Sequence, residues 1–148
     1  MTKTMTGGCQ CGRVRYEVDV EDDDAYLCHC KMCQHATGGF AAAFKNVKFA
    51  NVRFEQEPDW YASSPIAKRP FCSCCGTPLG FRFNDGSENI DLTVGSFDDP
   101  SALKPDSHFG AESIHEAWID TSGLKRIRSD EHPTLAQKWI DAGSKLPE

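Results

Sequence analysis

The sequence predicts a mostly β fold with one short helix near its C-terminal end. Apolar and polar residues alternate in several short runs, which is typical of strands that bury one face. Only the last part of the chain shows helical spacing. Because no linker-like segment interrupts the 148 residues, we expect a single domain over residues 1–148.

The strand patterns follow one another along the chain. The first covers residues 13–20, where four apolar side chains share one face: Val14, Tyr16, Val18 and Val20. Similar alternation predicts strands at 40–44, 79–83 and 90–94, and weaker patterns lie at 47–54, 58–62 and 113–119. The turn residues Asn84-Asp85-Gly86 predict that the 79–83 and 90–94 strands form a hairpin.

The predicted helix covers about residues 133–142. Leu135 and Trp139 lie four residues apart after Pro133, and Gly143 offers a stop. This helix belongs to a C-terminal extension beyond the cysteine-containing part of the chain.

Composition and charge exclude some classes of function. The chain carries 22 acidic against 16 basic residues, a net charge of −6, which argues against nucleic-acid binding. No apolar run approaches the roughly 18 residues that a membrane span needs. The N-terminus lacks the apolar stretch of a secretory signal, so we expect a cytoplasmic protein.

Eight cysteines gather in three short motifs, which are Cys9-Gln10-Cys11-Gly12, Cys28-His29-Cys30-Lys31-Met32-Cys33 and Cys72-Ser73-Cys74-Cys75-Gly76. In a reducing compartment such spacing favours metal binding over disulfides. The glycines after Cys11 and Cys75 permit the positive φ that metal-binding turns often adopt. Clustering of this kind indicates zinc.

Counting ligands divides the cysteines into two sets. A structural zinc takes four tetrahedral ligands, whereas a catalytic zinc takes three and keeps one place open. The first and third motifs supply a four-cysteine set: Cys9, Cys11, Cys72 and Cys75. The middle motif supplies a three-cysteine set within one short loop: Cys28, Cys30 and Cys33. We therefore expect two zinc ions, one in a closed site and one in an open site.

Other interpretations remain open from the residues alone. Disulfides and buried free thiols explain three tight motifs poorly. Cys74 could complete the second zinc site, although we expect it to be the odd thiol out. His29 or His35 could also supply a fourth ligand, although His29 lies between two ligands and should point away from their metal.

The ordered motifs resemble the glutathione-dependent formaldehyde-activating enzyme family, which includes centromere protein V-like zinc proteins. The matching runs are Gly8 to Tyr16, Cys28-His29-Cys30-x-x-Cys33 and Phe71-Cys72-x-x-Cys75-Gly76-Thr77-Pro78-Leu79, followed by Gly95 to Pro100, His108 and Trp118. The resemblance covers about residues 7–120. It implies a zinc-stabilised, β-sandwich-like domain related to methionine sulfoxide reductase B and to zinc-containing Rab-interacting chaperones.

The resemblance also implies an activity and its site. Carried over by position, the structural zinc falls on the four-cysteine set and the catalytic zinc on the three-cysteine set. The implied reaction is that of a carbon–sulfur lyase, which joins formaldehyde to the glutathione thiol and gives S-hydroxymethylglutathione. Two positions depart from the family pattern: Gln34-His35 stands where a basic residue is frequent, and Cys74 occupies a spacer.

Charge bears on this chemistry, because zinc with three thiolates is net −1 and accepts a further anion poorly. Lys31 inside the middle motif is the nearest candidate to offset the charge and contact substrate, and Lys68 and Arg69 precede the third motif. Two alternatives to the lyase are a non-catalytic, chaperone-like binding module and a thiol-repair enzyme that uses Cys74.

Overall fold

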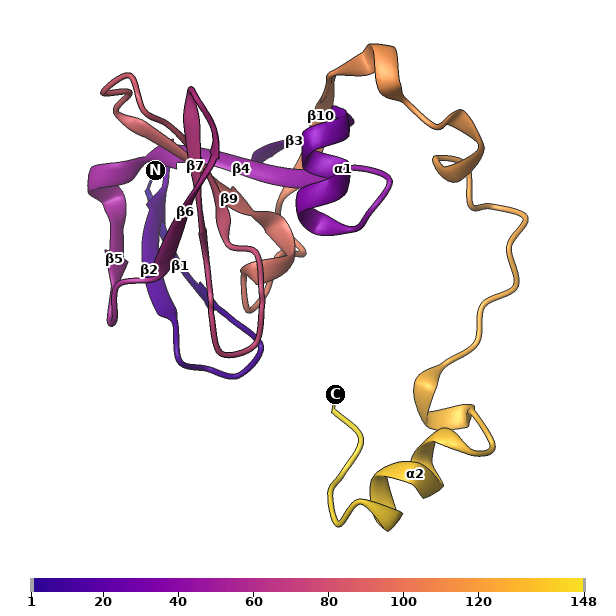
Figure 1. Cartoon of the computed structure of the whole chain (residues 1–148). Helices are drawn as coiled ribbons and strands as arrows, with labels where there is room; N and C mark the ends of the chain where they lie inside the picture. Colours follow the sequence, from indigo (N-terminus) through magenta and orange to yellow (C-terminus); the bar gives the residue numbers. More distant parts are fainter. Residues whose placement is uncertain (1, 148) are drawn as a thin grey trace. The chain divides into compact units, whose positions relative to one another are not determined.

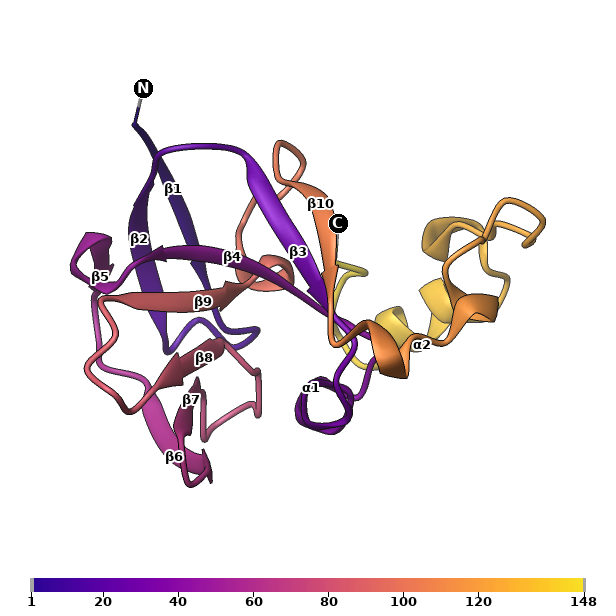
Figure 2. The same cartoon turned by 90° about the horizontal axis from the view of Figure 1, so that it is seen from above.

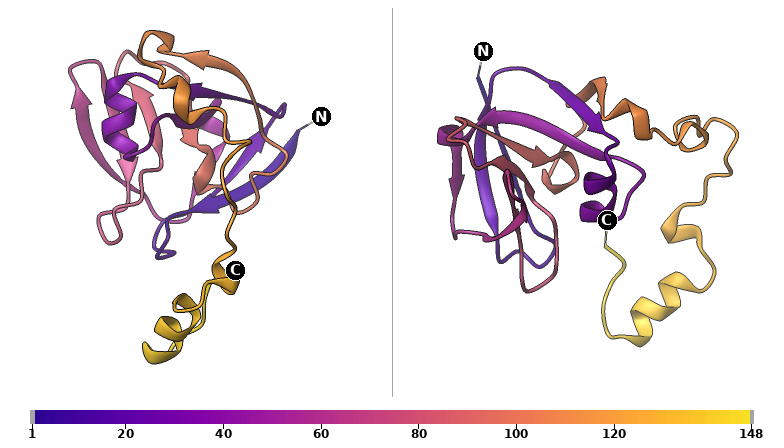
Figure 3. Two further views of the ribbon diagram at one scale, coloured as in Figure 1. Left: turned by 90° about the vertical axis from the view of Figure 1, so that its right-hand side faces the viewer. Right: turned by 45° about the horizontal axis from the view of Figure 1, so that its top comes forward.

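The computed structural model describes residues 2–147, which divide into two compact units with a boundary between His115 and Glu116. In its described residues the first unit is built from ten strands in two sheets and one short helix, α1 (Lys31–Thr37). The second unit contains helix α2 (Leu135–Asp141) and the short 3-10 turns Glu116–Trp118 and Ser129–Glu131. Figure 3 shows α2 in yellow.

The smaller sheet has three antiparallel strands in the order β1 (Lys3–Gly8), β2 (Arg15–Val20) and β5 (Val52–Phe54). The larger sheet has seven strands, in the order β10 (Lys104–Phe109), β3 (Asp24–Cys28), β4 (Ala42–Lys48), β9 (Asn89–Thr93), β8 (Gly80–Phe83), β7 (Ala67–Phe71) and β6 (Asp59–Ser64). Strands β10 and β3 are parallel, and the other pairs are antiparallel. Figures 1 and 2 show β1 and β2 crossing β4 steeply.

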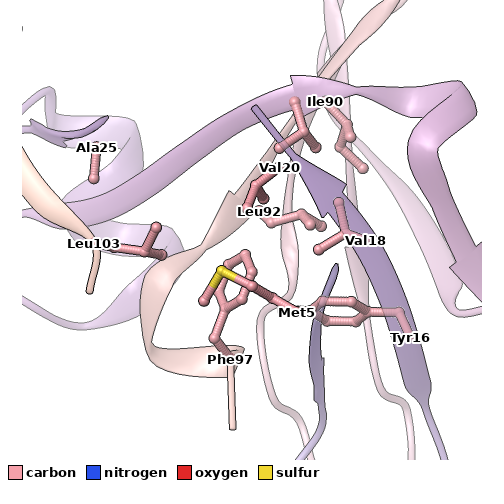
Figure 4. Packing of buried hydrophobic residues seen from close by; sticks show 10 residues of the cluster. Met5, Tyr16, Val18, Val20, Ala25, Ile90, Leu92, Phe97 and Leu103 are labelled. Carbon is pink, nitrogen blue, oxygen red and sulfur yellow. The ribbon is translucent and has the colours of Figure 1, made fainter. Parts of the chain in front are cut away.

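The core lies where these two sheets face each other. Side chains from β1, β2, β4 and β9 form one buried cluster, which Figure 4 shows together with Phe97 and Leu103. Tyr16 packs edge-on against Phe54 and Phe97. The Ser96 hydroxyl donates to the Thr93 carbonyl (2.7 Å) and therefore accepts from the Tyr16 hydroxyl (2.8 Å). This bond satisfies the one polar atom that Tyr16 brings into the core.

The mostly β fold class and the C-terminal helix are confirmed. The 13–20 pattern corresponds to β2, and the predicted hairpin is the antiparallel pair β8–β9. The 40–44 pattern starts two residues early, because Gly38 ends α1 in a left-handed conformation and the strand begins at Ala42. The prediction of a single domain over residues 1–148 stays a prediction.

The strand predicted at 113–119 is wrong. Residues 111–113 and 116–118 form 3-10 turns instead. The N–H of Ser113 donates to the Gly110 carbonyl (3.0 Å), and that of Ile119 to the Glu116 carbonyl (3.2 Å). Local bonds of this kind use the backbone groups that a sheet would need. No helix within residues 2–147 combines the length and apolarity needed to cross a membrane.

We expect the bond between Tyr16 and Ser96 to be worth about 1 kcal/mol of folding free energy. Tyr16→Phe should lower the free energy of unfolding by about that amount. Ser96→Ala should cost more, about 1–3 kcal/mol, because it leaves a buried hydroxyl without this acceptor. Urea denaturation of both variants and the double variant measures the coupling, and strictly additive losses would contradict the assignment.

Candidate metal centres

The four-cysteine set forms where two turns of the chain meet. Cys9 and Cys11 follow β1, while Cys72 and Cys75 follow β7. The Sγ atoms of Cys9 and Cys11 lie 3.6 Å apart, and those of Cys11 and Cys72 3.8 Å apart. All four sulfur atoms lie within 4.8 Å of one another. As the cysteine spacing suggested, the glycines after Cys11 and Cys75 have φ of 80° and 78°.

Hydrogen-bond donors surround these sulfur atoms. The Val14 N–H donates to Cys9 Sγ (3.2 Å). Arg13 Nε donates to Cys72 Sγ (3.4 Å), and this bond lowers the pKa of Cys72. A bond with the Thr77 hydroxyl (3.1 Å) lowers the pKa of Cys75 to about 5. At Cys72 and Cys75 the environment therefore favours the thiolate, which is the form that binds metal.

Arg13 is itself held in place by an acid. Asp59 forms an ion pair with its guanidinium and accepts a hydrogen bond from the Ser73 N–H (2.8 Å). One carboxylate thus connects the cation beside the cluster to the turn that carries Cys72. The arrangement fixes the Arg13 side chain toward the sulfur atoms.

The three-cysteine set lies at the junction of β3 and α1. Cys28 ends the strand, Cys30 caps the helix, and Cys33 lies in its first turn. The sequence suggested a short loop, but the motif instead spans the end of a strand and the start of a helix. The Sγ atoms of Cys28 and Cys30 lie 3.5 Å apart, and the three sulfur atoms lie within 4.8 Å of one another. Burial raises the pKa of Cys28 to about 12.

Neighbouring segments hold this junction in position. The Cys33 N–H donates to Cys30 Sγ (3.4 Å), and the His29 N–H donates to the Phe109 carbonyl (2.8 Å). Gly110 passes so close that a Cβ there would lie 2.7 Å from the Cys30 nitrogen, and its φ is +63°. A side chain at residue 110 would therefore displace the motif.

Among the described residues, Arg69 is the cation that donates a hydrogen bond to one of these three sulfur atoms. Its Nη2 donates to Cys33 Sγ (3.5 Å), its side chain is only 4% exposed, and its guanidinium lies over the Phe81 ring. Lys68 instead lies over the Trp60 ring. Of the three bases considered from the sequence, Arg69 is the one that contacts the set.

The donor set fits zinc. Four sulfur ligands about 2.3 Å from a tetrahedral zinc lie about 3.8 Å apart, close to the separations of 3.5–3.8 Å between sulfur atoms in the two sets. Among residues 2–147, no histidine or carboxylate joins either set. Cys74 is exposed and belongs to neither. The seven thiols thus gather in the two groups that ligand counting gave, while their metal ions and the ligand roles stay predictions.

Three other residues singled out by sequence lie around the middle motif: His29, Gln34 and His108. His29 is buried, and its Nε2 lies 2.8 Å from His108 Nδ1, on the side of β10. Gln34 donates to the carbonyls of His29 (2.6 Å) and Ser113 (3.2 Å). Gln34 is one of the two departures from the family pattern, and its side chain connects the middle motif to Ser113, near the end of the first unit.

Two cavities lie near the middle motif and share Met32 and Arg69 in their linings. The smaller, about 350 Å³, also contains Lys31 and His35. The larger, about 680 Å³, is lined by all three cysteines and by aromatic and aliphatic side chains. It is therefore the cavity in which a ligand can reach the sulfur atoms.

Asp91 lies in the wall of the larger cavity and was not predicted. It is only 8% exposed, and burial raises its pKa, while Asn46 Nδ2 donates to its Oδ1 (2.8 Å). The signal in the sequence was a single acid between two core residues, Ile90 and Leu92. A buried carboxyl of this kind can exchange a proton with a ligand in the cavity.

Comparisons with known proteins agree with this geometry. The chain is 31% identical over 80 residues to a protein of Schizosaccharomyces pombe named an uncharacterized lyase, covering 54% of this chain and 58% of that one. The match thus spans somewhat over half of the relative's length. A crystal structure of a Rhodobacter sphaeroides protein superposes with a TM-score of 0.57 at 24% identity, over 70% of this chain and 99% of the other. That likeness shows the fold.

The family model described as glutathione-dependent formaldehyde-activating enzyme matches residues 4–113, which contain both cysteine sets and the larger cavity. The chain belongs to the glutathione-dependent formaldehyde-activating enzyme family.

Proposed function

We propose that this protein is a zinc-dependent carbon–sulfur lyase that interconverts a thiol and an aldehyde with their S-hydroxyalkyl adduct. Glutathione and formaldehyde are the reactants that the family description supports, and the S. pombe relative is named a lyase. The observation that carries the proposal is a set of three thiols, not four, in the wall of a large cavity.

In this proposal the four-cysteine set holds a structural zinc and the three-cysteine set holds the catalytic one. A zinc ion held by the three cysteines would supply an open coordination place at which a substrate thiol is ionised. Arg69 offsets part of the negative charge that three thiolates bring together. Lys31 in the lining of the smaller cavity suits the carboxylates of glutathione.

The reaction also requires the transfer of a proton. When a thiol adds to an aldehyde, a carbon–sulfur bond forms, the carbonyl π bond breaks, and the oxygen takes up a proton. Asp91 is the acidic side chain of the cavity wall, and burial raises its pKa. We assign it the transfer of this proton in both directions.

The two sites should differ in their structural weight. We expect two zinc ions per chain by elemental analysis. Cys11→Ser should lower the melting temperature sharply, because the four-cysteine set joins segments 61 residues apart and a structural zinc contributes on the order of 10 kcal/mol. Cys30→Ser should remove one zinc at a smaller cost in stability, since its set lies within six residues. Equal destabilisation by the two variants would contradict an open second site.

Arg69 should strengthen metal binding at the second site. Arg69→Gln removes the buried cation beside Cys33, so we expect about tenfold weaker retention of one zinc, as for other groups that contact metal ligands. Lys68→Gln is the matched control, because Lys68 is adjacent in sequence but lies over Trp60. Competition with a chromophoric chelator measures both variants. Unchanged retention in Arg69→Gln would show that its charge has no such role.

The activity itself is tested by exchange NMR of glutathione with formaldehyde, expressed as acceleration over the uncatalysed reaction per mole of zinc-loaded protein. We expect an acceleration that Cys30→Ser abolishes and Cys74→Ser preserves, because Cys74 lies outside both sets. Asp91→Asn should lower the rate at least tenfold without loss of zinc.

Two results would overturn the proposal. If the wild type gives no acceleration and cobalt substituted for zinc shows no spectral change with any thiol, the site is closed. The protein would then be a zinc-stabilised binding module. Loss of activity in Cys74→Ser would instead favour the thiol-repair alternative.

A further inference from the structure

The larger cavity is far bigger than formaldehyde requires. A water molecule occupies about 30 Å³ of liquid, so a molecule with two heavy atoms needs roughly twice that volume. The cavity has about 680 Å³, which is within the range of sites that enclose much larger organic ligands. The size of this cavity indicates that one of the two reactants carries a substituent.

The lining gives the chemistry of that substituent. Next to the three cysteines stand four phenylalanines and an isoleucine from strands of the larger sheet and the turn before β7: Phe44, Ile66, Phe81, Phe83 and Phe109. Phe81 and Phe83 pack edge-to-face, with ring centroids 4.9 Å apart. Three of the five are markedly exposed, with Ile66 64%, Phe83 43% and Phe109 68% accessible. Exposed apolar side chains gathered around one cavity mark a place where apolar surface is bound.

The polar groups of the wall suit an anionic occupant poorly. Asp91 contributes a carboxyl to the wall, and the guanidinium of Arg69 is already directed at Cys33 Sγ. Burying the carboxylates of glutathione here would leave them without a cation of their own, which costs free energy. The smaller cavity shares Met32 and Arg69 with the larger one and also contains Lys31, so it suits those carboxylates better. The body of glutathione and the apolar group therefore belong in different cavities.

We propose that the larger cavity binds the substituent of the aldehyde, and that the preferred aldehyde carries a neutral apolar group of about the size of a 2-phenylethyl group. This inference rests on the proposed function for the identity of the reaction. Atoms balance as with formaldehyde: the thiol sulfur bonds to the carbonyl carbon, the π bond breaks, and one proton moves from sulfur to oxygen.

Turnover provides the first test. With glutathione fixed, we expect kcat/KM for 3-phenylpropanal to exceed that for formaldehyde and for glyoxylate, whose carboxylate would have no cation of its own in the cavity. Phe83→Ser should lower kcat/KM for 3-phenylpropanal about tenfold and change that for formaldehyde less than twofold. Phe40→Ser is the matched control, because Phe40 is similarly exposed (40%) and lines neither cavity. A preference for apolar thiols with formaldehyde, but not for apolar aldehydes, would overturn the assignment.

Binding separates this inference from the proposed function. The alcohol 3-phenylpropan-1-ol cannot react, so saturation-transfer NMR with the zinc-loaded protein reports occupancy of the cavity without turnover. We expect binding in the wild type and Phe40→Ser, and binding about tenfold weaker in Phe83→Ser. If this result appears while no aldehyde turns over, the cavity assignment stands and the lyase proposal fails.

Absence of binding in folded, zinc-loaded wild-type protein overturns the inference. So does a dimer in sedimentation velocity that Phe83→Ser dissociates, since the exposed phenylalanines would then form an interface between copies of the chain.

Discussion

Thiols gathered within 4.8 Å of one another become strongly repulsive when they ionise, and the protein must supply positive charge and N–H groups at both sets. This electrostatic requirement explains several features that otherwise look unrelated. Arg13 points at Cys72 because Asp59 and the neighbouring backbone fix it there. Arg69 is one of the few charged residues with almost no exposed surface, and it contacts Cys33.

The two sets differ in how they are tied to the fold. The four-cysteine set connects the turn after β1 with the turn after β7, so it joins the smaller sheet to the larger one. The three-cysteine set belongs to one short segment. Hydrogen bonds of Gln34 to His29 and Ser113 and the close approach of Gly110 hold this segment in position. The first arrangement suits a part of the structure that must not open, and the second leaves one side of the sulfur atoms facing a cavity.

Sequence reasoning succeeded where local pattern determines structure. Period-two alternation identified β2 because this strand buries one face against the core. It also located β8 and β9 from their alternating apolar residues, although β9 is buried on both faces and β8 does not alternate in burial. It missed β10, whose six residues are all exposed and therefore carry no alternation. It also missed α1, which spans only seven residues and begins inside the cysteine motif. Its strand at 113–119 failed because local turns use the backbone groups there.

The site was predictable to the extent that its members are close in sequence or bear distinctive chemistry. Cysteines are distinctive in the sequence, so the division of seven thiols into two groups followed from their spacing. Arg69 stood out only as a base near the third motif, and its contact with Cys33 depends on how β7 passes α1. The cavity was not predictable, because its four phenylalanines come from three different strands and each one alone looks like an ordinary core residue.

This division between the thiols and the cavity wall has a chemical consequence. The sulfur atoms are positioned by a strand end, a helix start and a fixed arginine, none of which depends on Phe83 or Ile66. Those two side chains project from β8 and from the turn before β7, and they are largely exposed. Changing them alters the volume and polarity of the cavity without moving a thiol. In the proposed function, the reaction and the size of its substrate are therefore set by different residues, so that one set of cysteines could serve aldehydes larger than the one for which the family is named.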